Sequence, residues 1–213
     1  MQIIKVDSNK PPQDSLDNSS IQTLLAVFER SEAFVYPTDT VYGLGVNAFD
    51  EKAVNRLFSI KKRPPQKPVP VMVKDIEMAK EIAYINTEKQ KMLEKMWPGA
   101  VTIILKRRAG IPPLLSAHGT TIGLRIPDSS FVQGLVEILN KPITGTSANL
   151  SGNPSTHSSQ EVVNTLGNSS PAPQLLFDAG ELEHNDPSTV VDLTGEEPAI
   201  VRMGPITKKN LPF

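Results

Sequence analysis

Residues Asp50–Val73, DEKAVNRLFSIKKRPPQKPVPVMV, pass from a helical pattern to an extended one within a single short stretch. Asp50 is a suitable N-cap, and apolar residues follow it at the spacing of one helix face. Pro64 disfavours helical geometry in the residue before it, so the helix should end near Lys62. Val69–Val73 then has the pattern of a strand, although its prolines suit only an edge or irregular one. A helix followed by a strand is typical of an α/β fold.

The same alternation continues outward in both directions. Helical periodicity predicts further helices over residues 21–28, 75–82, 87–97, 129–139 and 158–167. Their expected N-caps are Ser19 with Ser20, Thr87 with Gln90, Ser129 with Ser130, and Ser158 with Ser159. Apolar runs predict strands over residues 33–36, 101–105, 122–126, 142–146, 175–177, 189–193 and 199–203, and a loop is expected over 37–45. We therefore expect one α/β domain with a mixed sheet, because many connections are too short for crossover helices.

Composition excludes several kinds of protein. The 213 residues include no cysteine, which rules out disulfides and thiolate metal sites, and the three histidines are not spaced as a metal-ligand pair. No apolar run approaches the ~20 residues that a membrane span needs, and Met1–Ser20 lacks the pattern of a signal peptide. We expect a cytoplasmic protein without membrane association.

Positive charge is concentrated in one part of a nearly neutral chain. Residues 52–74 contain seven basic side chains and no acidic one, whereas the net charge of the whole chain is −1. Such a local concentration suggests a pocket for a small polyanion rather than a broad nucleic-acid surface.

Lys61 and Arg63 stand two residues apart within that basic stretch. In an extended segment, which Pro64 and Pro65 favour, both side chains would point to the same side and could bind adjacent phosphate groups. The alternative is a solvated basic helix end, where lysine and arginine are favourable against the helix dipole.

Ser147 and Asn149 are also two residues apart, just after the predicted strand 142–146. Polar groups at the carboxyl end of a strand are where α/β sheets place ligands. An ordinary turn would use the same residue types, so both interpretations stay open.

Four further polar residues lie in or beside predicted strands. Thr40 could bind a small zwitterion, unless its loop is simply a turn capped by Asp39. Arg125 ends an apolar strand and needs a carboxylate, which either the protein or a ligand could supply. Ser188 and Arg202 are similar polar groups, for which structural roles also stay open.

The segments taken together resemble one family. The chain carries, in order, Pro37–Gly45, Lys61-x-Arg63-Pro64, Trp97-Pro98-Gly99, Arg125-Ile126-Pro127, Ser147-Ala148-Asn149 with Ser151-Gly152, and Ser188-Thr189 before Arg202-x-Gly204. This ordered set is similar to that of the YrdC/Sua5 family, the threonylcarbamoyl-AMP synthases, and the likeness extends from about Ile21 to Pro205. Each motif alone is weak, but the ordered set is specific.

The resemblance implies an architecture. It is an open, twisted, mixed α/β sheet with flanking helices and a concave, positively charged cleft. It divides the chain into an N-terminal tail, a YrdC-like domain and a C-terminal tail, over residues 1–20, 21–207 and 208–213. It also implies the short form, without the additional C-terminal Sua5 domain.

The resemblance further implies a nucleotidyltransferase reaction. L-threonine and bicarbonate form an N-carboxy threonine, which attacks the α-phosphorus of ATP, releases pyrophosphate and leaves threonylcarbamoyl-AMP. A tRNA threonylcarbamoyl transferase complex then modifies adenosine 37 of tRNA, and a weak direct contact with tRNA would fit this role. The chain has no Walker or Rossmann phosphate loop and no nucleophile-elbow motif, but a carbamate is already a nucleophile. Mg²⁺, bound mainly by the nucleotide, would help to neutralise the phosphates.

Site residues follow from the same resemblance, position by position. Lys61 and Arg63 match a phosphate-binding pair, and Ser147 and Asn149 match the second half of that site, so these four are the expected catalytic residues. Further expected contacts with ATP come from Lys67, Thr121, Ser155 and Arg202. Expected contacts with threonine come from Thr40, Arg125, Ser188 and the backbone of Gly145, with Arg125 pairing with the threonine carboxylate. No metal ligand is expected from the protein.

The chain departs from the family pattern at four positions. Met72 stands where many relatives have histidine, and Lys67 stands where asparagine is common. Ala100 replaces a common proline and Pro187 a usual glutamate. These changes bear on threonine specificity and leave the expected phosphate-binding set intact.

Two other functions are compatible with parts of the pattern. The basic stretch would suit a double-stranded RNA or tRNA-binding module, although the net charge of −1 and the lack of aromatic stacking residues oppose it. The second is a carbamoyl-adenylate domain like that of hydrogenase-maturation carbamoyltransferases, which would use carbamoyl phosphate in place of threonine and bicarbonate.

Overall fold

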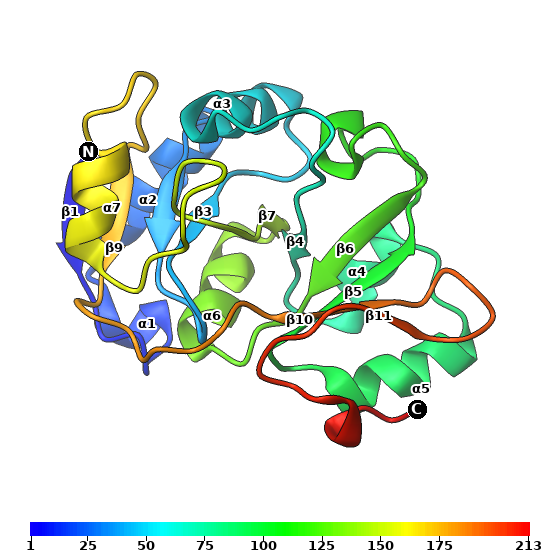
Figure 1. Cartoon of the computed structure of the whole chain (residues 1–213). Helices are drawn as coiled ribbons and strands as arrows, with labels where there is room; N and C mark the ends of the chain where they lie inside the picture. Colours follow the sequence, from blue (N-terminus) through cyan, green and yellow to red (C-terminus); the bar gives the residue numbers. More distant parts are fainter.

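The strands of the protein fall into two sheets, in a computed structural model that describes residues 1–213 (Figure 1). The strands are β1 (Gln2–Lys5), β2 (Phe34–Tyr36), β3 (Gly43–Gly45), β4 (Val71–Met72), β5 (Val101–Lys106), β6 (Thr121–Arg125), β7 (Ile143–Thr144), β8 (Thr146–Ser147), β9 (Leu175–Asp178), β10 (Thr189–Asp192) and β11 (Ala199–Arg202). The first sheet has the order β1-β9-β2-β3-β8 and the second β11-β10-β5-β6-β4-β7. Both contain parallel and antiparallel pairs, which confirms the mixed α/β class with two sheets in place of one.

The helices surround these sheets (Figure 1). They are α1 (Pro12–Ser15), α2 (Asn18–Glu29), α3 (Glu51–Lys61), α4 (Ile76–Ile82), α5 (Thr87–Met96), α6 (Ser130–Leu139) and α7 (Ser159–Leu166), with short 3-10 helices η1 (Pro113–Ser116) and η2 (Lys208–Asn210). Asp50 caps α3 as predicted, because its carboxylate accepts from the backbone N–H groups of Lys52 and Ala53 at 2.9 and 3.2 Å. Ser129 likewise caps α6.

Three other caps differ from the prediction. Asp17 caps α2 by accepting from the backbone of Ser20 at 2.8 Å, and Asn86 caps α5 by accepting from the backbone of Lys89 at 2.9 Å. Ser19, Ser20 and Thr87 lie inside the first turns, because Asp17 and Asn86 are the residues with the extended backbone that an N-cap requires. Ser158 stands at the N-cap of α7 but makes no capping hydrogen bond with its side chain.

Gly145 separates two strands that lie in different sheets. The segment 142–146, expected as one strand, is divided into β7, which pairs with β4, and β8, which pairs with β3. A Cβ atom at Gly145 would stand 2.7 Å from Cε of Met72, so the backbone passes through a space that only glycine fits without displacing a neighbour. The backbone N–H of Gly145 donates to the carbonyl of Pro70 at 2.8 Å, which extends the β4–β7 ladder of the second sheet by one residue. The Thr144 hydroxyl of β7 donates to the carbonyl of Leu44 in β3 at 3.0 Å and joins the two sheets at this point.

Residues 43–45 form β3 rather than the end of a loop. β3 lies between β2 and β8 in the first sheet, and its glycines face the aromatic rings of β2. A Cβ atom at Gly43 would stand 2.7 Å from the ring of Tyr36. These glycines therefore allow close side-chain packing across the sheet, which the sequence pattern alone does not distinguish from a turn signal.

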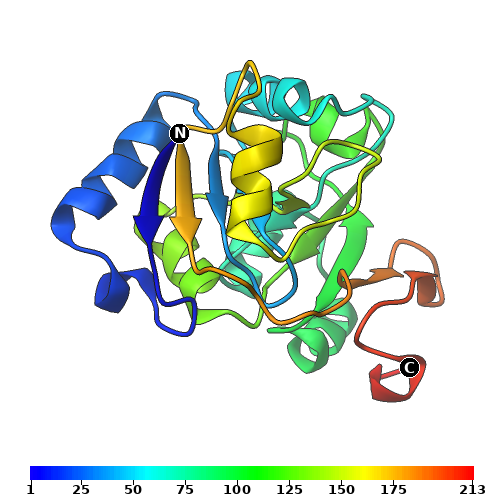
Figure 2. The same cartoon turned by 60° about the vertical axis from the view of Figure 1, so that its left-hand side comes forward.

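The first 20 residues, expected as a tail, contain folded elements. β1 forms one edge of the first sheet in parallel with β9, from the pair Gln2 and Leu175 to the pair Lys5 and Asp178 (Figure 2). α1 contacts α6, where Pro12 packs against the position of Gly134. A boundary at residue 20 therefore falls inside α2 and not at the start of the folded chain.

A single apolar core connects both halves of the molecule. One cluster of 50 buried hydrophobic residues draws on both sheets and on helices from α2 to α7, so the chain folds around one core. None of the helices combines the length and apolar character that crossing a membrane requires.

Candidate active site

A cavity of about 400 Å³ lies between the carboxyl end of β6, the β8 end of the first sheet and the β10–β11 pair. Both sheets contribute to its lining, together with the loop after β2 and the segment that precedes β4. Its lining includes Arg63, Arg125 and Arg202 and no acidic side chain. Arginine side chains are suited to binding carboxylate and phosphate groups.

The loop after β2 forms a tight turn around Thr38. The Thr38 hydroxyl accepts from the backbone N–H groups of Thr40 and Val41 at 3.0 and 3.1 Å and donates to the Val41 carbonyl at 2.7 Å. Thr38, and not Asp39, is therefore the capping residue of this turn. The carboxylate of Asp39 is left to contact another part of the chain.

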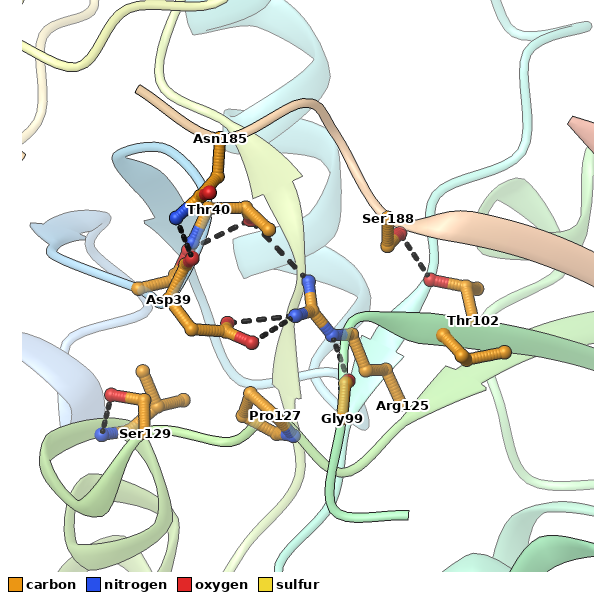
Figure 3. Close-up of polar contacts among 12 residues, drawn as sticks. Asp39, Thr40, Gly99, Thr102, Arg125, Pro127, Ser129, Asn185 and Ser188 are labelled. Atoms are coloured by element: carbon orange, nitrogen blue, oxygen red, sulfur yellow. Dashed lines mark hydrogen bonds and ion pairs between the residues drawn. The ribbon is translucent and has the colours of Figure 1, made fainter. Parts of the chain in front are cut away.

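Arg125, at the end of β6, receives that carboxylate (Figure 3). Its Nη2 donates to both oxygens of Asp39 at 2.7 and 2.6 Å, and its Nε donates to the carbonyl of Gly99 at 2.9 Å. Its Nη1 lies 3.5 Å from the hydroxyl of Thr40, which lines the cavity. Burial lowers the pKa of Arg125 from its usual value, while Asp39 opposes this shift. The sequence left open whether the protein or a ligand supplies a carboxylate to Arg125. The protein supplies one, that of Asp39.

The opposite wall carries a second polar group, around Ser188 (Figure 3). The hydroxyls of Ser188 and Thr102 are 2.8 Å apart and form a hydrogen bond in which either can donate. Arg202 donates through Nε and Nη2 to the backbone carbonyl of Ser188 at 3.1 and 2.6 Å. These bonds hold Arg202, the last residue of β11, beside the start of β10 at the edge of the cavity.

Arg63 follows the end of α3 and does not form an extended pair with Lys61. α3 continues to Lys61, and Lys62 takes the left-handed conformation, with φ 49° and ψ 43°. This kink directs Arg63 into the cavity lining, where Nε donates to the carbonyl of Lys67 at 3.0 Å and Nη2 to that of Pro68 at 2.8 Å. Its Nη1 has no acceptor within the protein, so it can donate to an anion in the cavity.

Lys61 lies behind the cavity wall and is only 1% exposed. Its ammonium donates to the backbone carbonyl of Ser147, to the backbone carbonyl of Asn149 at 2.8 Å, and to Oδ1 of Asn149 at 3.3 Å. A lysine has three N–H donors, so this loop uses all of them. Burial, and to a lesser degree the charge of Arg63, lower the pKa of Lys61 to about 7.

The loop above Lys61 is also held by its own side chains. The Ser147 hydroxyl donates to Oδ1 of Asn149, and Nδ2 of Asn149 donates to the carbonyls of Leu150 and Asn153, at 3.0 and 2.6 Å. Ser147 faces the cavity, whereas Asn149 is buried beneath it. The pair is therefore divided between a lining residue and a supporting one.

The structure brings eight of the twelve expected site residues to the cavity lining. They are Thr40, Arg63, Arg125, Gly145, Ser147, Ser155, Ser188 and Arg202. The other four lie outside the lining: Lys61 and Asn149 below it, Lys67 with an exposed side chain, and Thr121 at the other end of β6 from Arg125.

Sequence reasoning missed two contributors to this site. Asp39 was considered only as a turn cap, and Thr102 was counted as part of an apolar strand. A threonine within an otherwise apolar, buried strand is a detectable signal, because its hydroxyl needs a partner. Nothing in the sequence indicates that Asp39 meets Arg125, since 86 positions separate them.

Comparisons with known proteins agree with this geometry. The model of the Sua5_yciO_yrdC family, described as "Telomere recombination", matches residues 26–204. The chain belongs to this Sua5/YciO/YrdC family. The threonylcarbamoyl-AMP synthase of Pyrococcus abyssi is 32% identical over 90% of this chain and 56% of its own length. The chain thus spans little more than half of that relative.

Solved structures of the Sua5/YciO/YrdC family share the fold. Sua5 of P. abyssi, in complex with L-threonine, superposes with a TM-score of 0.86 at 30% identity, over 96% of this chain and 58% of the other. YciO of E. coli superposes with a TM-score of 0.85 at 26% identity, over 99% of this chain and 98% of its own. The fold and family inferred from the ordered motifs are therefore confirmed.

Two of the four departures from the family pattern lie in the cavity lining. Met72 is 5% exposed and packs its thioether against Gly145, and Pro187 precedes Ser188 in the opposite wall. The other two do not face the cavity. Ala100 accepts from the backbone of Thr189 at 2.9 Å, and Lys67 contributes only its carbonyl to Arg63.

Proposed function

We propose that this protein is an L-threonylcarbamoyladenylate synthase. The products would be threonylcarbamoyl-AMP and pyrophosphate, made from L-threonine, bicarbonate and ATP. The observation that carries the proposal is the presence of two distinct polar groups in one cavity. Arg63 and Ser147 form one group, and Thr40, Arg125 and Ser188 form the other.

The first group suits the triphosphate of ATP. Arg63 offers the two donors of its Nη1, and Ser147 places a hydroxyl in the lining on a loop that Lys61 and Asn149 hold in place. The hydroxyl hydrogen goes to Oδ1 of Asn149 in this structure and would turn to a phosphate oxygen when ATP binds. Arg202, at the cavity edge, adds a further positive charge. Phosphoryl transfer depends mostly on positioning and charge neutralisation, and these groups supply both.

The second group suits a small amino acid. Arg125 and the Thr40 hydroxyl can bind a carboxylate, and the Ser188 hydroxyl lies across the cavity. The known complex of P. abyssi Sua5 with L-threonine supports threonine as that amino acid. Threonine condenses with bicarbonate to a carbamate and water, and a carbamate oxygen then attacks the α-phosphorus while pyrophosphate leaves. No side-chain nucleophile is required.

We include Mg²⁺ in the proposal as an ion carried by the triphosphate, whose charge it would neutralise. The cavity lining has hydroxyl and carbonyl oxygens but no carboxylate, and no three potential His, Cys, Asp or Glu ligands cluster anywhere in the structure. This donor set fits an ion held chiefly by phosphate oxygens.

The product would pass to a tRNA threonylcarbamoyl transferase complex. We place this step in the cytoplasm, with at most a weak contact between this protein and tRNA. An RNA-binding module would lose affinity steeply with salt, because several phosphate contacts release counterions. We expect a shallow salt dependence here, and a steep one would favour the RNA-binding alternative.

The decisive test is the release of pyrophosphate from ATP. We expect release only when threonine and bicarbonate are both present, and we expect carbamoyl phosphate not to replace them. ATP turnover that is indifferent to threonine would refute the proposal.

A further inference from the structure

We infer that Asp39 is a positioning residue, which orients Arg125 so that one edge of its guanidinium is presented to the carboxylate of the bound amino acid. This inference rests on the proposed function. It concerns a residue that does not line the cavity and that contacts the substrate only through Arg125.

A count of donors shows how the guanidinium is divided. Arginine has five N–H donors: one on Nε, two on Nη1 and two on Nη2. The protein takes four of them: Nε donates to Gly99, Nη2 donates to both carboxylate oxygens of Asp39, and Nη1 makes a long contact of 3.5 Å with the Thr40 hydroxyl. One donor of Nη1 remains, on the side of the guanidinium that lies beside Thr40 in the cavity lining (Figure 3).

Thr40 completes the remaining edge. The Thr38 hydroxyl gives its hydrogen to the Val41 carbonyl and accepts from two backbone N–H groups, so its two lone pairs are occupied. The Thr40 hydroxyl lies 3.1 Å from that of Thr38, but Thr38 has no free lone pair to accept its hydrogen, so this hydrogen is left for a ligand. Nη1 of Arg125 and the Thr40 hydroxyl together offer adjacent donors for the two oxygens of one carboxylate.

Asp39 is itself fixed from two sides. It follows Thr38 in the tight turn, and its backbone carbonyl accepts from Nδ2 of Asn185 at 3.2 Å. Asn185 belongs to the segment that leads to Ser188 on the opposite wall. The carboxylate therefore stands on backbone that both walls of the cavity help to hold, as a positioning residue requires.

The test is the Asp39→Asn variant, which keeps the shape of the side chain and removes its charge. Without the ion pair the guanidinium can rotate away from Thr40. We expect the KM for threonine to rise about tenfold to hundredfold, as for the loss of one charge-assisted contact, with the KM for ATP within about twofold of the parent. A control is Glu32→Gln, which removes the charge from the Glu32–Arg56 ion pair, 2.9 Å long, partly covered and outside the cavity lining. The control should leave both KM values unchanged.

Several outcomes would overturn the inference. One is an unchanged KM for threonine in Asp39→Asn. Another is an equal rise in the KM values for threonine and ATP, which would indicate that the variant loosens the whole cavity. If Asp39→Asn does not fold, Asp39→Glu decides, because its longer side chain keeps the charge and must displace the guanidinium. A threonine KM raised about threefold or more, with ATP unaffected, supports positioning, and a parent-like value refutes it. If the unchanged protein releases pyrophosphate from ATP independently of threonine, the proposed function itself fails. That result is distinct from a failure of the positioning role of Asp39.

Discussion

The ammonium of Lys61 donates twice to Asn149, across 88 positions of sequence, through the backbone carbonyl at 2.8 Å and Oδ1 at 3.3 Å. A third bond goes to the Ser147 carbonyl. The lysine therefore acts from beneath as a support for the loop that carries Ser147 into the cavity. This position gives it a different part in the site from that of Arg63, which lines the cavity directly.

We predict that Lys61→Met loosens this loop. The variant leaves two buried backbone carbonyls without a donor, which should lower the free energy of unfolding by about 1–3 kcal/mol. Activity should also fall, because the Ser147 hydroxyl loses its fixed position. Urea unfolding and pyrophosphate release measure the two effects. Lys62→Met is the matched control, since Lys62 is adjacent and exposed, and it should behave like the parent.

The same lysine predicts a pH dependence of stability. Its pKa in the folded protein is about 7, whereas an unfolded lysine titrates near about 10.4. Between these values the unfolded chain binds more protons, so the free energy of unfolding of the parent should rise with pH, by up to about 1.4 kcal/mol per pH unit. Below a pH of about 7 the lysine is charged in both the folded and the unfolded chain, so its contribution to the pH dependence of stability disappears. Lys61→Met should lack the slope, and parallel curves for parent and variant would show that burial does not perturb this group.

Arg63→Ala should reduce the rate of pyrophosphate release by about tenfold to hundredfold, because it removes the proposed charge-assisted contact with the phosphates of ATP. The exposed neighbour gives the control: Lys62→Ala should remain within about twofold of the parent. A smaller effect is expected from Lys67→Ala, because that side chain is exposed and lies outside the cavity lining. Equal losses in all three variants would point to a diffuse electrostatic effect in place of a defined contact.

Gly145→Ala should be destabilising through its contact with Met72. The new Cβ would stand 2.7 Å from Cε of Met72 and 3.0 Å from both Cγ and Sδ. Because the crowded atoms belong to a flexible side chain, we expect a cost of about 1 kcal/mol. Met72→Ala should relieve this cost, so the double variant should be more stable than the sum of the single effects predicts. Simple additivity would mean that the backbone, and not the thioether, resists the change.

Sequence reasoning recovered what is encoded locally. The helix from Asp50 to the residues before Pro64 could be predicted, because a cap, an apolar stripe and a proline all act within a few residues. The same holds for most other helices and for the long strands. The division at Gly145 could not be predicted in this way, since it depends on which distant strands pair with its two neighbours.

The candidate site shows the same limit. The ordered motifs identified eight residues that line the cavity, but they did not distinguish lining from support. Lys61 and Asn149 each stand two positions from a residue of the cavity lining, Arg63 and Ser147 respectively. Burial and hydrogen bonding nevertheless place both of them behind the lining. The capping role expected of Asp39 belongs to Thr38, because either side chain could close that turn and only the fold decides which one does.

The junction of the two sheets at Gly145 bears on how reactants could enter the cavity. At this junction one continuous chain runs from β7 to β8, and the Thr144 hydroxyl donates to the Leu44 carbonyl of β3 at 3.0 Å. We therefore expect little movement of one sheet relative to the other here. On the opposite side, the segment around Asn185 is attached by the contact of its Nδ2 with the Asp39 carbonyl at 3.2 Å and of its carbonyl with Nε2 of His157 at 3.0 Å. If the cavity widens to admit a nucleotide, we expect the movement in this segment and not at the junction of the two sheets.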